Sequence, residues 1–242
     1  MLSKLGTSIL NRLYLTFAQQ RVDVRTNPGM VSFTFDDFPA TALASGGAIL
    51  EQAGWRGTYY TAMGLLGTES ESGRIASPDE LRDCAARGHE IANHTLSHLN
   101  CVRTARGPLV GDVLENVRTL PPESSLNFAY PFGATNTRVI RTLHRHIATG
   151  RGVHNGINAS QSDPKNLKAN PVYSDRGLNE CLALVDENAA RGGWLIFYTH
   201  DVQESPSEFG CTPQDFTALV DAVRASGMDV VTVEQGRQRL AL

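Results

Sequence analysis

The chain has 242 residues, of which 41% are hydrophobic and 19% charged, values typical of a globular protein with one sizeable core. Its formal net charge of -3 offers no positive field for nucleic acid, and no stretch is long and apolar enough to span a bilayer. The four cysteines are scattered without a C-x-x-C pair, which favours reduced thiols over disulfides. They are Cys84, Cys101, Cys181 and Cys211.

The N-terminal segment, residues 1–25, has apolar residues such as Ile9 and Leu13 at helical spacing. Polar residues, Asn11 among them, interrupt it, so it lacks the unbroken apolar core of a secretory signal peptide. We therefore predict an amphipathic helix packed on a single domain of residues 26–242, and a cytoplasmic location. A helix that associates peripherally with a membrane surface, or with a partner, is the alternative interpretation.

Strand-like and helix-like patterns alternate along the rest of the chain. Strands are predicted at 31–35, 57–61, 89–93, 127–130, 146–149, 194–199 and 229–233. Helices are predicted at 40–53, 78–87, 111–120, 136–145, 177–190 and 213–226. This rhythm favours parallel strands joined by helical crossovers, and no linker or repeat divides it. The sequence therefore predicts an α/β fold, a single-domain distorted (β/α) barrel with about seven parallel strands.

Titratable residues follow three of these strands. The first strand ends in Asp36 and Asp37, the third is followed by His94 and His98, and the sixth by His200. In barrels of this kind the chemistry takes place at the carboxyl ends of the strands, so we expect these side chains to share one pocket.

Two imidazoles and one carboxylate form a common catalytic zinc set with one position left open. His94 and His98 are four residues apart, so one turn or a compact loop can direct both at one point, and Asp37 is the natural third ligand. Asp36 is then left for proton transfer. Taken singly these signals are weak, because an aspartate pair often caps a helix and spaced histidine pairs occur by chance. His89 begins its strand, so we expect a structural role for it.

The ordered set of motifs resembles the polysaccharide deacetylase family, also called the NodB homology domain or carbohydrate esterase family 4. The sequences TFDD at 34–37, HTLSH at 94–98, YPFG at 130–133 and YTHD at 198–201 are similar to four of its motifs. The resemblance extends over roughly residues 30–235. It implies a metal-dependent hydrolase that removes N-acetyl groups from an amino sugar, oligosaccharide or polysaccharide.

The resemblance also implies a role for each motif residue. It makes Asp36 the catalytic base, His200 the general acid, and a backbone N–H near Phe132 an oxyanion donor. The metal ligands that it implies are Asp37, His94 and His98, holding zinc, with Co²⁺ or Ni²⁺ as alternatives. The segment implied to hold substrate and oxyanion is Tyr130, Pro131 and Phe132.

The sequence departs from the family pattern in three ways. Phe38 replaces a glycine and is expected to add bulk at the pocket rim. Ala129 stands where an arginine often supports the base; Arg151 is predicted to supply that charge, with a solvated loop residue as the alternative. The family's fourth motif cannot be found in this sequence, so the residue whose carboxylate orients His200 is not assigned. The candidates are Asp163, Asp175 and Asp201.

Two other functions remain open at this point. One is a cyclic amide or ureide hydrolase on the same fold, and the other is an inactive carbohydrate-binding relic. The presence of both Asp36 and His200 argues against the relic, because binding alone needs neither. For carbohydrate contacts we favour Tyr130, Phe132 and Tyr198, whereas Tyr59, Tyr60 and Trp194 are predicted to pack in the core.

Overall fold

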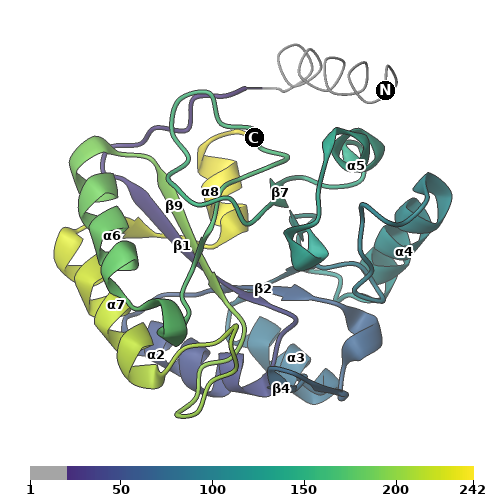
Figure 1. The fold of residues 1–242 in the computed structure, drawn as a ribbon, viewed down its shortest axis with the longest axis horizontal. Coiled ribbons are helices and arrows are strands. Elements are labelled where there is room, and N and C mark those ends of the chain that lie inside the picture. Colours follow the sequence, from purple (N-terminus) through teal and green to yellow (C-terminus); the bar gives the residue numbers. More distant parts are fainter. Residues whose placement is uncertain (1–20) are drawn as a thin grey trace, which may run out of the picture.

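The computed structural model describes residues 21–242 of the chain, and in this part a parallel sheet forms the centre (Figure 1). The strands pair in the order β7-β6-β5-β2-β1-β9-β8, and β10 pairs with the start of β1. Their bounds are β1 (Met30–Asp36), β2 (Thr58–Thr61), β5 (Glu90–Asn93), β6 (Phe128–Ala129), β7 (Gly150–Arg151), β8 (Asn170–Pro171), β9 (Trp194–Thr199) and β10 (Asp229–Val230). A small antiparallel hairpin, β3 (Glu69–Ser70) and β4 (Gly73–Arg74), lies outside this sheet.

The two ends of the sheet order approach each other. Arg151 of β7 forms a parallel bridge with Leu167, three residues before β8, and β8 pairs in turn with β9. The sheet therefore curls almost into a closed ring, and the predicted distorted (β/α) barrel is confirmed.

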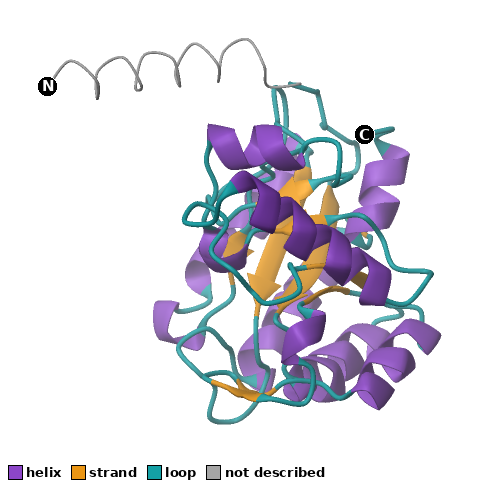
Figure 2. Ribbon diagram, turned by 90° about the vertical axis from the view of Figure 1, so that its right-hand side faces the viewer, coloured by secondary structure: helices purple, strands orange, loops and turns teal. Residues whose placement is uncertain are grey.

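Helices cover the outside of the sheet (Figures 1 and 2). They are α2 (Ala48–Gln52), α3 (Pro78–Ala86), α4 (Arg106–Thr119), α5 (Thr137–Leu143), α6 (Asn179–Arg191), α7 (Pro213–Ser226) and α8 (Val233–Arg239), with short helical turns η1 (Ala42–Gly47), η2 (Met63–Leu65), η3 (Pro131–Gly133) and η4 (Ser174–Arg176). The predicted start of α3 is confirmed, because Ser77 and Glu80 form a reciprocal capping box. None of the helices described in residues 21–242 is long and apolar enough to cross a membrane.

Strand β1 explains how the aspartates reach the site. All seven of its residues are buried, as expected for a parallel strand that is covered on both faces. Phe33 and Phe35 pack on Phe216 of α7 in the helical layer. Side chains alternate along a strand, so Thr34 and Asp36 point the other way, into the barrel. The four cysteines are buried and free, which confirms the predicted thiols.

The structure corrects several element boundaries. The strand expected at 146–149 forms later, as β7, because the N–H groups of His146 and Ile147 still donate to the Leu143 carbonyl in the turn that ends α5. Helix α4 starts five residues before the predicted 111, and β8 and α8 were not predicted. Residues 1–20 of the predicted N-terminal helix lie outside the described residues, while residues 21–25 form no helix and Val22 bridges Ser162.

Candidate active site

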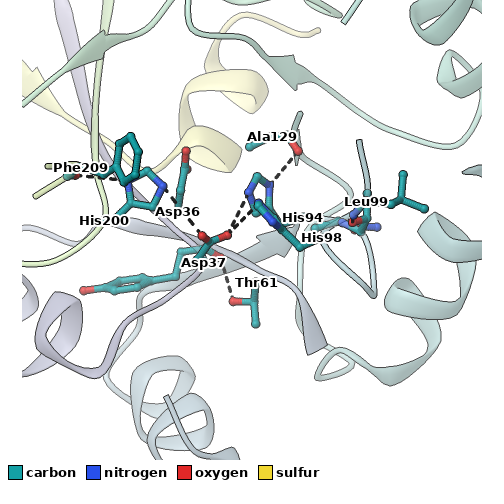
Figure 3. Close-up of polar contacts among 12 residues, drawn as sticks. Asp36, Asp37, Thr61, His94, His98, Leu99, Ala129, His200 and Phe209 are labelled. Carbon is teal, nitrogen blue, oxygen red and sulfur yellow. Dashed lines mark hydrogen bonds and ion pairs between the residues drawn. The ribbon is translucent and has the colours of Figure 1, made fainter. Parts of the chain in front are cut away.

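A cavity of about 640 Å³ opens at the carboxyl ends of the barrel strands. The predicted acidic and imidazole residues that line it come from the ends of β1, β5 and β9 (Figure 3). They are Asp36, Asp37, His94, His98 and His200. The structure therefore brings together the three clusters that sequence spacing placed at separate strand ends.

Asp37, His94 and His98 form a group whose ligand atoms all lie within 4.8 Å of one another. Asp37 Oδ1 is 3.1 Å from His98 Nε2 and 3.4 Å from His94 Nε2, yet this buried oxygen accepts no hydrogen bond from any described residue. A buried carboxylate oxygen without a donor is costly, and three ligand atoms that converge in this way suit one shared cation. The residues present therefore fit a divalent metal ion.

The two histidines are directed by their surroundings. A backbone carbonyl only accepts hydrogen bonds, so the 2.9 Å contact between His94 Nδ1 and the Ala129 oxygen means that Nδ1 carries a proton and Nε2 is free to bind a metal. The turn that carries both histidines is held by α4, where Asp112 accepts the N–H groups of Leu96 and Ser97.

Burial and neighbouring charges shift the pKa values of two of these residues, His98 and Asp37. Burial, together with the nearby charge of His94, lowers the pKa of His98 to about 4, so its imidazole is neutral at pH 7. Burial opposes ionisation of Asp37, but the three imidazoles of His94, His98 and His200 outweigh it and lower the pKa of that carboxyl below its usual value.

Asp36 lies at the end of β1, with its side chain inside the barrel. The guanidinium of Arg151 donates to Asp36 Oδ1 and forms an ion pair with it. Because β7 and β1 are not neighbours in the sheet, this pair crosses the barrel interior. Arg151 is completely buried, so the alternative of a solvated loop residue is wrong.

Two aromatic rings flank the same arginine. The Arg151 guanidinium carbon lies 5.1 Å from the centre of the Tyr60 ring and 4.9 Å from that of Tyr198. Burial alone would lower the pKa of Arg151, but the Asp36 carboxylate and these tyrosines raise it overall. The cation therefore stays charged and keeps its place beside Asp36.

His200 is oriented by a backbone group. Its Nδ1 lies 3.2 Å from the Phe209 carbonyl oxygen, and its Nε2 lies 3.9 Å from Asp37 Oδ2. The expectation of an aspartate partner is corrected: among the contacts of the described residues, none joins Asp163, Asp175 or Asp201 to the imidazole.

The residues of the third motif, at 130–133, lie partly in the core and partly at the cavity. Tyr130 is 1% exposed, its N–H donates to the Arg151 carbonyl and its hydroxyl to that of Lys165, so the predicted substrate contact is wrong. Pro131 is buried beside it. Phe132 is 68% exposed and lines the cavity, and its ring centre lies 4.5 Å from that of His98.

Other aromatic predictions can be compared with the structure. Tyr198 lines the cavity, and Tyr59, Tyr60 and Trp194 are fully buried, as predicted. The bulk expected at the rim from Phe38 is absent, because its left-handed backbone, at φ 64°, turns the ring into the core against Tyr59.

Sequence reasoning missed part of the cavity wall. Tyr173 follows β8, Phe209 lies in the loop after β9, and the hairpin of β3 and β4 contributes Glu71. Arg176 also lines the wall and stacks on Tyr173 at 5.0 Å. Strands of two residues have no detectable periodicity, so no signal in the sequence indicated these neighbours.

Known proteins resemble this chain over most of its length. The sequence model for polysaccharide deacetylase matches residues 23–149. A chitin deacetylase of Colletotrichum lindemuthianum is 28% identical over 215 residues, which cover 86% of this chain and 79% of that protein.

Solved structures share the fold. The structure of the chitin deacetylase from the fungal pathogen Colletotrichum lindemuthianum aligns with a TM-score of 0.58 at 19% identity, covering 89% of this chain and 90% of the other. The Xyl-CE4 domain of a multidomain xylanase from the hindgut metagenome of Trinervitermes trinervoides aligns with a TM-score of 0.60 at 18% identity, covering 89% and 93%.

Proposed function

The chain belongs to the polysaccharide deacetylase family, and on this premise we propose that it is a metal-dependent hydrolase that removes N-acetyl groups from an amino sugar, oligosaccharide or polysaccharide. One observation carries the proposal. A carboxylate held by a buried arginine, a group suited to a metal, and an imidazole held by a carbonyl all face one cavity. We further propose that residues 26–242 act as one catalytic domain.

We assign Asp37, His94 and His98 as the ligands of one divalent ion, zinc first, with Co²⁺ or Ni²⁺ as alternatives. The unpartnered Asp37 Oδ1 and the proton on His94 Nδ1 support this assignment. When bound, such an ion supplies a Lewis acid that polarises the acetyl carbonyl and makes a water molecule more acidic.

Asp36 is the proposed general base. Arg151 fixes the direction of its carboxylate, so that a free oxygen can take the proton of the attacking water. A base held in this way contributes roughly 10²–10⁴-fold to the rate.

His200 is the proposed general acid. The acid is the imidazolium form: its Nδ1–H is committed to the Phe209 carbonyl, so the Nε2–H proton is the one delivered to the departing amine nitrogen, which leaves the imidazole with its remaining proton on Nδ1. An amine leaves poorly as an anion, and this proton transfer removes that barrier.

Phe132 is the member of the third motif that we assign to the oxyanion, through its peptide N–H. Its exposure at the cavity supports this role, whereas the Tyr130 N–H is already committed to the Arg151 carbonyl. The rings of Phe132, Tyr173, Tyr198 and Phe209 along the wall suit the apolar faces of sugar rings.

The test is acetate release from N-acetylglucosamine oligomers by metal-depleted and zinc-restored protein. We expect release that depends on the metal. Zinc-loaded protein that binds the oligomer without releasing acetate would support the relic, and ring opening of a cyclic ureide instead would support the other hydrolase. The cytoplasmic location and any membrane association through residues 1–25 stay predictions.

A further inference from the structure

The loop after β9 is built around the carboxylate of Asp201. This side chain is completely buried, and Oδ2 accepts the Ser207 N–H at 2.9 Å and the Gln203 amide at 2.8 Å. Oδ1 accepts the Ser207 hydroxyl at 2.5 Å. Within residues 21–242 no arginine or lysine forms an ion pair with Asp201, so these hydrogen bonds must offset the cost of burying it.

Ser207 connects this carboxylate to the next part of the loop. Its single hydroxyl proton is used on Asp201, so its oxygen acts as acceptor for the Phe209 N–H at 3.2 Å. Packing at the carboxylate is tight, because a Cβ on Gly210 would lie 2.3 Å from Asp201 Oδ1. The backbone N–H of Phe209 is therefore held by Ser207, and the residue after Phe209 must be glycine.

The Phe209 carbonyl, on the other side of the Cα of the same residue, meets the catalytic imidazole. The Phe209 carbonyl accepts the His200 backbone N–H at 3.0 Å and its Nδ1–H at 3.2 Å. The centres of the His200 and Phe209 rings lie 5.5 Å apart, and Figure 3 shows the imidazole between Phe209 and Asp37. A carbonyl that is fixed in place permits only the tautomer with the proton on Nδ1.

We propose that Asp201 and Ser207 are positioning residues, which act through the Phe209 carbonyl to hold His200 with Nδ1 protonated and Nε2 directed into the cavity. Asp201 thus acts on His200 without touching it, through Ser207 and the backbone of Phe209. The structural assignment stands on these contacts alone, and only its consequence for catalysis rests on the proposed deacetylase function.

The first test reads the tautomer directly, without a substrate. Nitrogen-15 spectra of the histidine rings are recorded for zinc-loaded protein at about pH 9, where unperturbed imidazoles are neutral. The His200→Ala variant assigns the His200 signals. We expect a protonated Nδ1 in the wild type and a mixture of tautomers in Ser207→Ala, with Ser207→Thr restoring the wild-type spectrum.

Gln203→Ala is the matched control, because it removes a hydrogen bond from the same carboxylate outside the path to His200. It should keep the wild-type spectrum. Protonated Nε2 in the wild type would overturn the proposal, as would a spectrum of His200 in Ser207→Ala that is identical to the wild type.

The second test separates positioning from general damage. Hydrolysis of 4-nitrophenyl acetate needs little acid catalysis because nitrophenolate leaves readily, whereas an N-acetylated sugar needs a proton on its amine. In Ser207→Ala we expect kcat on the N-acetylglucosamine oligomer to fall about tenfold or more, with the KM, the zinc content and the ester rate retained. Asp201→Asn should act in the same direction, and Ser207 is the safer site because it is only partly buried.

Equal losses on both substrates, or none on either, would mean that the loop has only a structural role and would overturn the catalytic consequence. If the wild type releases no acetate from any N-acetylated sugar, the proposed function fails, and the tautomer spectra still decide whether Asp201 and Ser207 position His200.

Discussion

The two sides of the cavity support their reactive groups in different ways. Asp36 is held by Arg151, a residue 115 positions away in sequence, through a buried ion pair across the barrel. His200 is held by a carbonyl only nine positions away, inside one loop. The counter-charge of the buried Asp36 carboxylate comes from a distant strand, whereas the imidazole of His200 needs only direction, which a local turn gives.

The difference has an energetic consequence. Breaking a buried ion pair from one side leaves an uncompensated charge and costs about 3–5 kcal/mol. Losing one hydrogen bond to a neutral group costs about 1–3 kcal/mol when a buried partner is left unsatisfied. We therefore expect the Asp36 side to control stability more strongly than the His200 side does.

The largest effect should come from the metal-binding group of Asp37, His94 and His98, which lies between Asp36 and His200 in the same cavity. In His98→Ala, zinc affinity should fall by more than about 100-fold, because changes outside the ligand set already cost 10–100-fold. Activity should disappear while Asp36 and His200 are untouched. Metal analysis and acetate release measure this, with exposed His154→Ala as the control. Full zinc occupancy in the double variant His94→Ala/His98→Ala would contradict the ligand assignment.

The next largest effect tests whether Asp36 acts as the general base while Asp37 binds the metal. Asp36→Asn should keep the metal and lower kcat by roughly 10²–10⁴-fold, the usual contribution of a general base. His200→Ala should lower kcat on an amide substrate by a similar factor and on an activated ester much less. Steady-state kinetics and zinc content are the measurements. Loss of zinc in Asp36→Asn would mean that Asp36 is a ligand.

The third prediction compares the two sides by stability. Arg151→Met should lower the free energy of unfolding by about 3–5 kcal/mol, and the double variant Asp36→Asn/Arg151→Met should recover most of it because no charge is left unpaired. The control is Arg176→Met at the exposed rim, for which we expect about 1 kcal/mol or less. Urea denaturation measures all three variants. Additive losses in the double variant would contradict the coupling of Asp36 and Arg151.

The turnover of Arg151→Met tests the same contact by activity. Without Arg151 the Asp36 carboxylate is no longer fixed in direction, so kcat should fall in steady-state kinetics while the zinc content is kept. Arg151→Lys should recover only part of the difference, because lysine lacks the planar fork of arginine. A kcat unchanged from the wild type would leave Arg151 with a structural role only.

The smallest effect concerns the aromatic support of the cation. Tyr60→Leu removes a ring that lies over Arg151 and should cost about 2 kcal/mol of stability, the scale of a desolvated cation–π contact. Tyr60→Phe is the matched control, since the buried Tyr60 hydroxyl has no hydrogen-bond partner among the described residues. It should remain close to wild type in thermal unfolding. Equal losses in both variants would show that the hydroxyl matters and the ring does not.

Local patterns in the sequence were enough for several features. Alternating strand and helix signals predicted the barrel and a helix that begins at residue 78, where α3 does begin. The spacing of His94 and His98 after one strand, and of Asp37 after another, predicted a group that the structure does bring together. These features depend on a few consecutive residues and on the rule that parallel strands end at one edge, so no distant contact is needed to infer them.

Only the tertiary structure decided which way other side chains point. Phe38 turns into the core, Tyr130 turns away from the cavity, and Arg151 crosses the barrel to Asp36, each according to packing against residues far away in sequence. The partner of His200 was beyond sequence reasoning for a simpler reason. It is the carbonyl of Phe209, and every residue has a backbone carbonyl, so nothing in the amino-acid pattern marks the one that a folded loop will present.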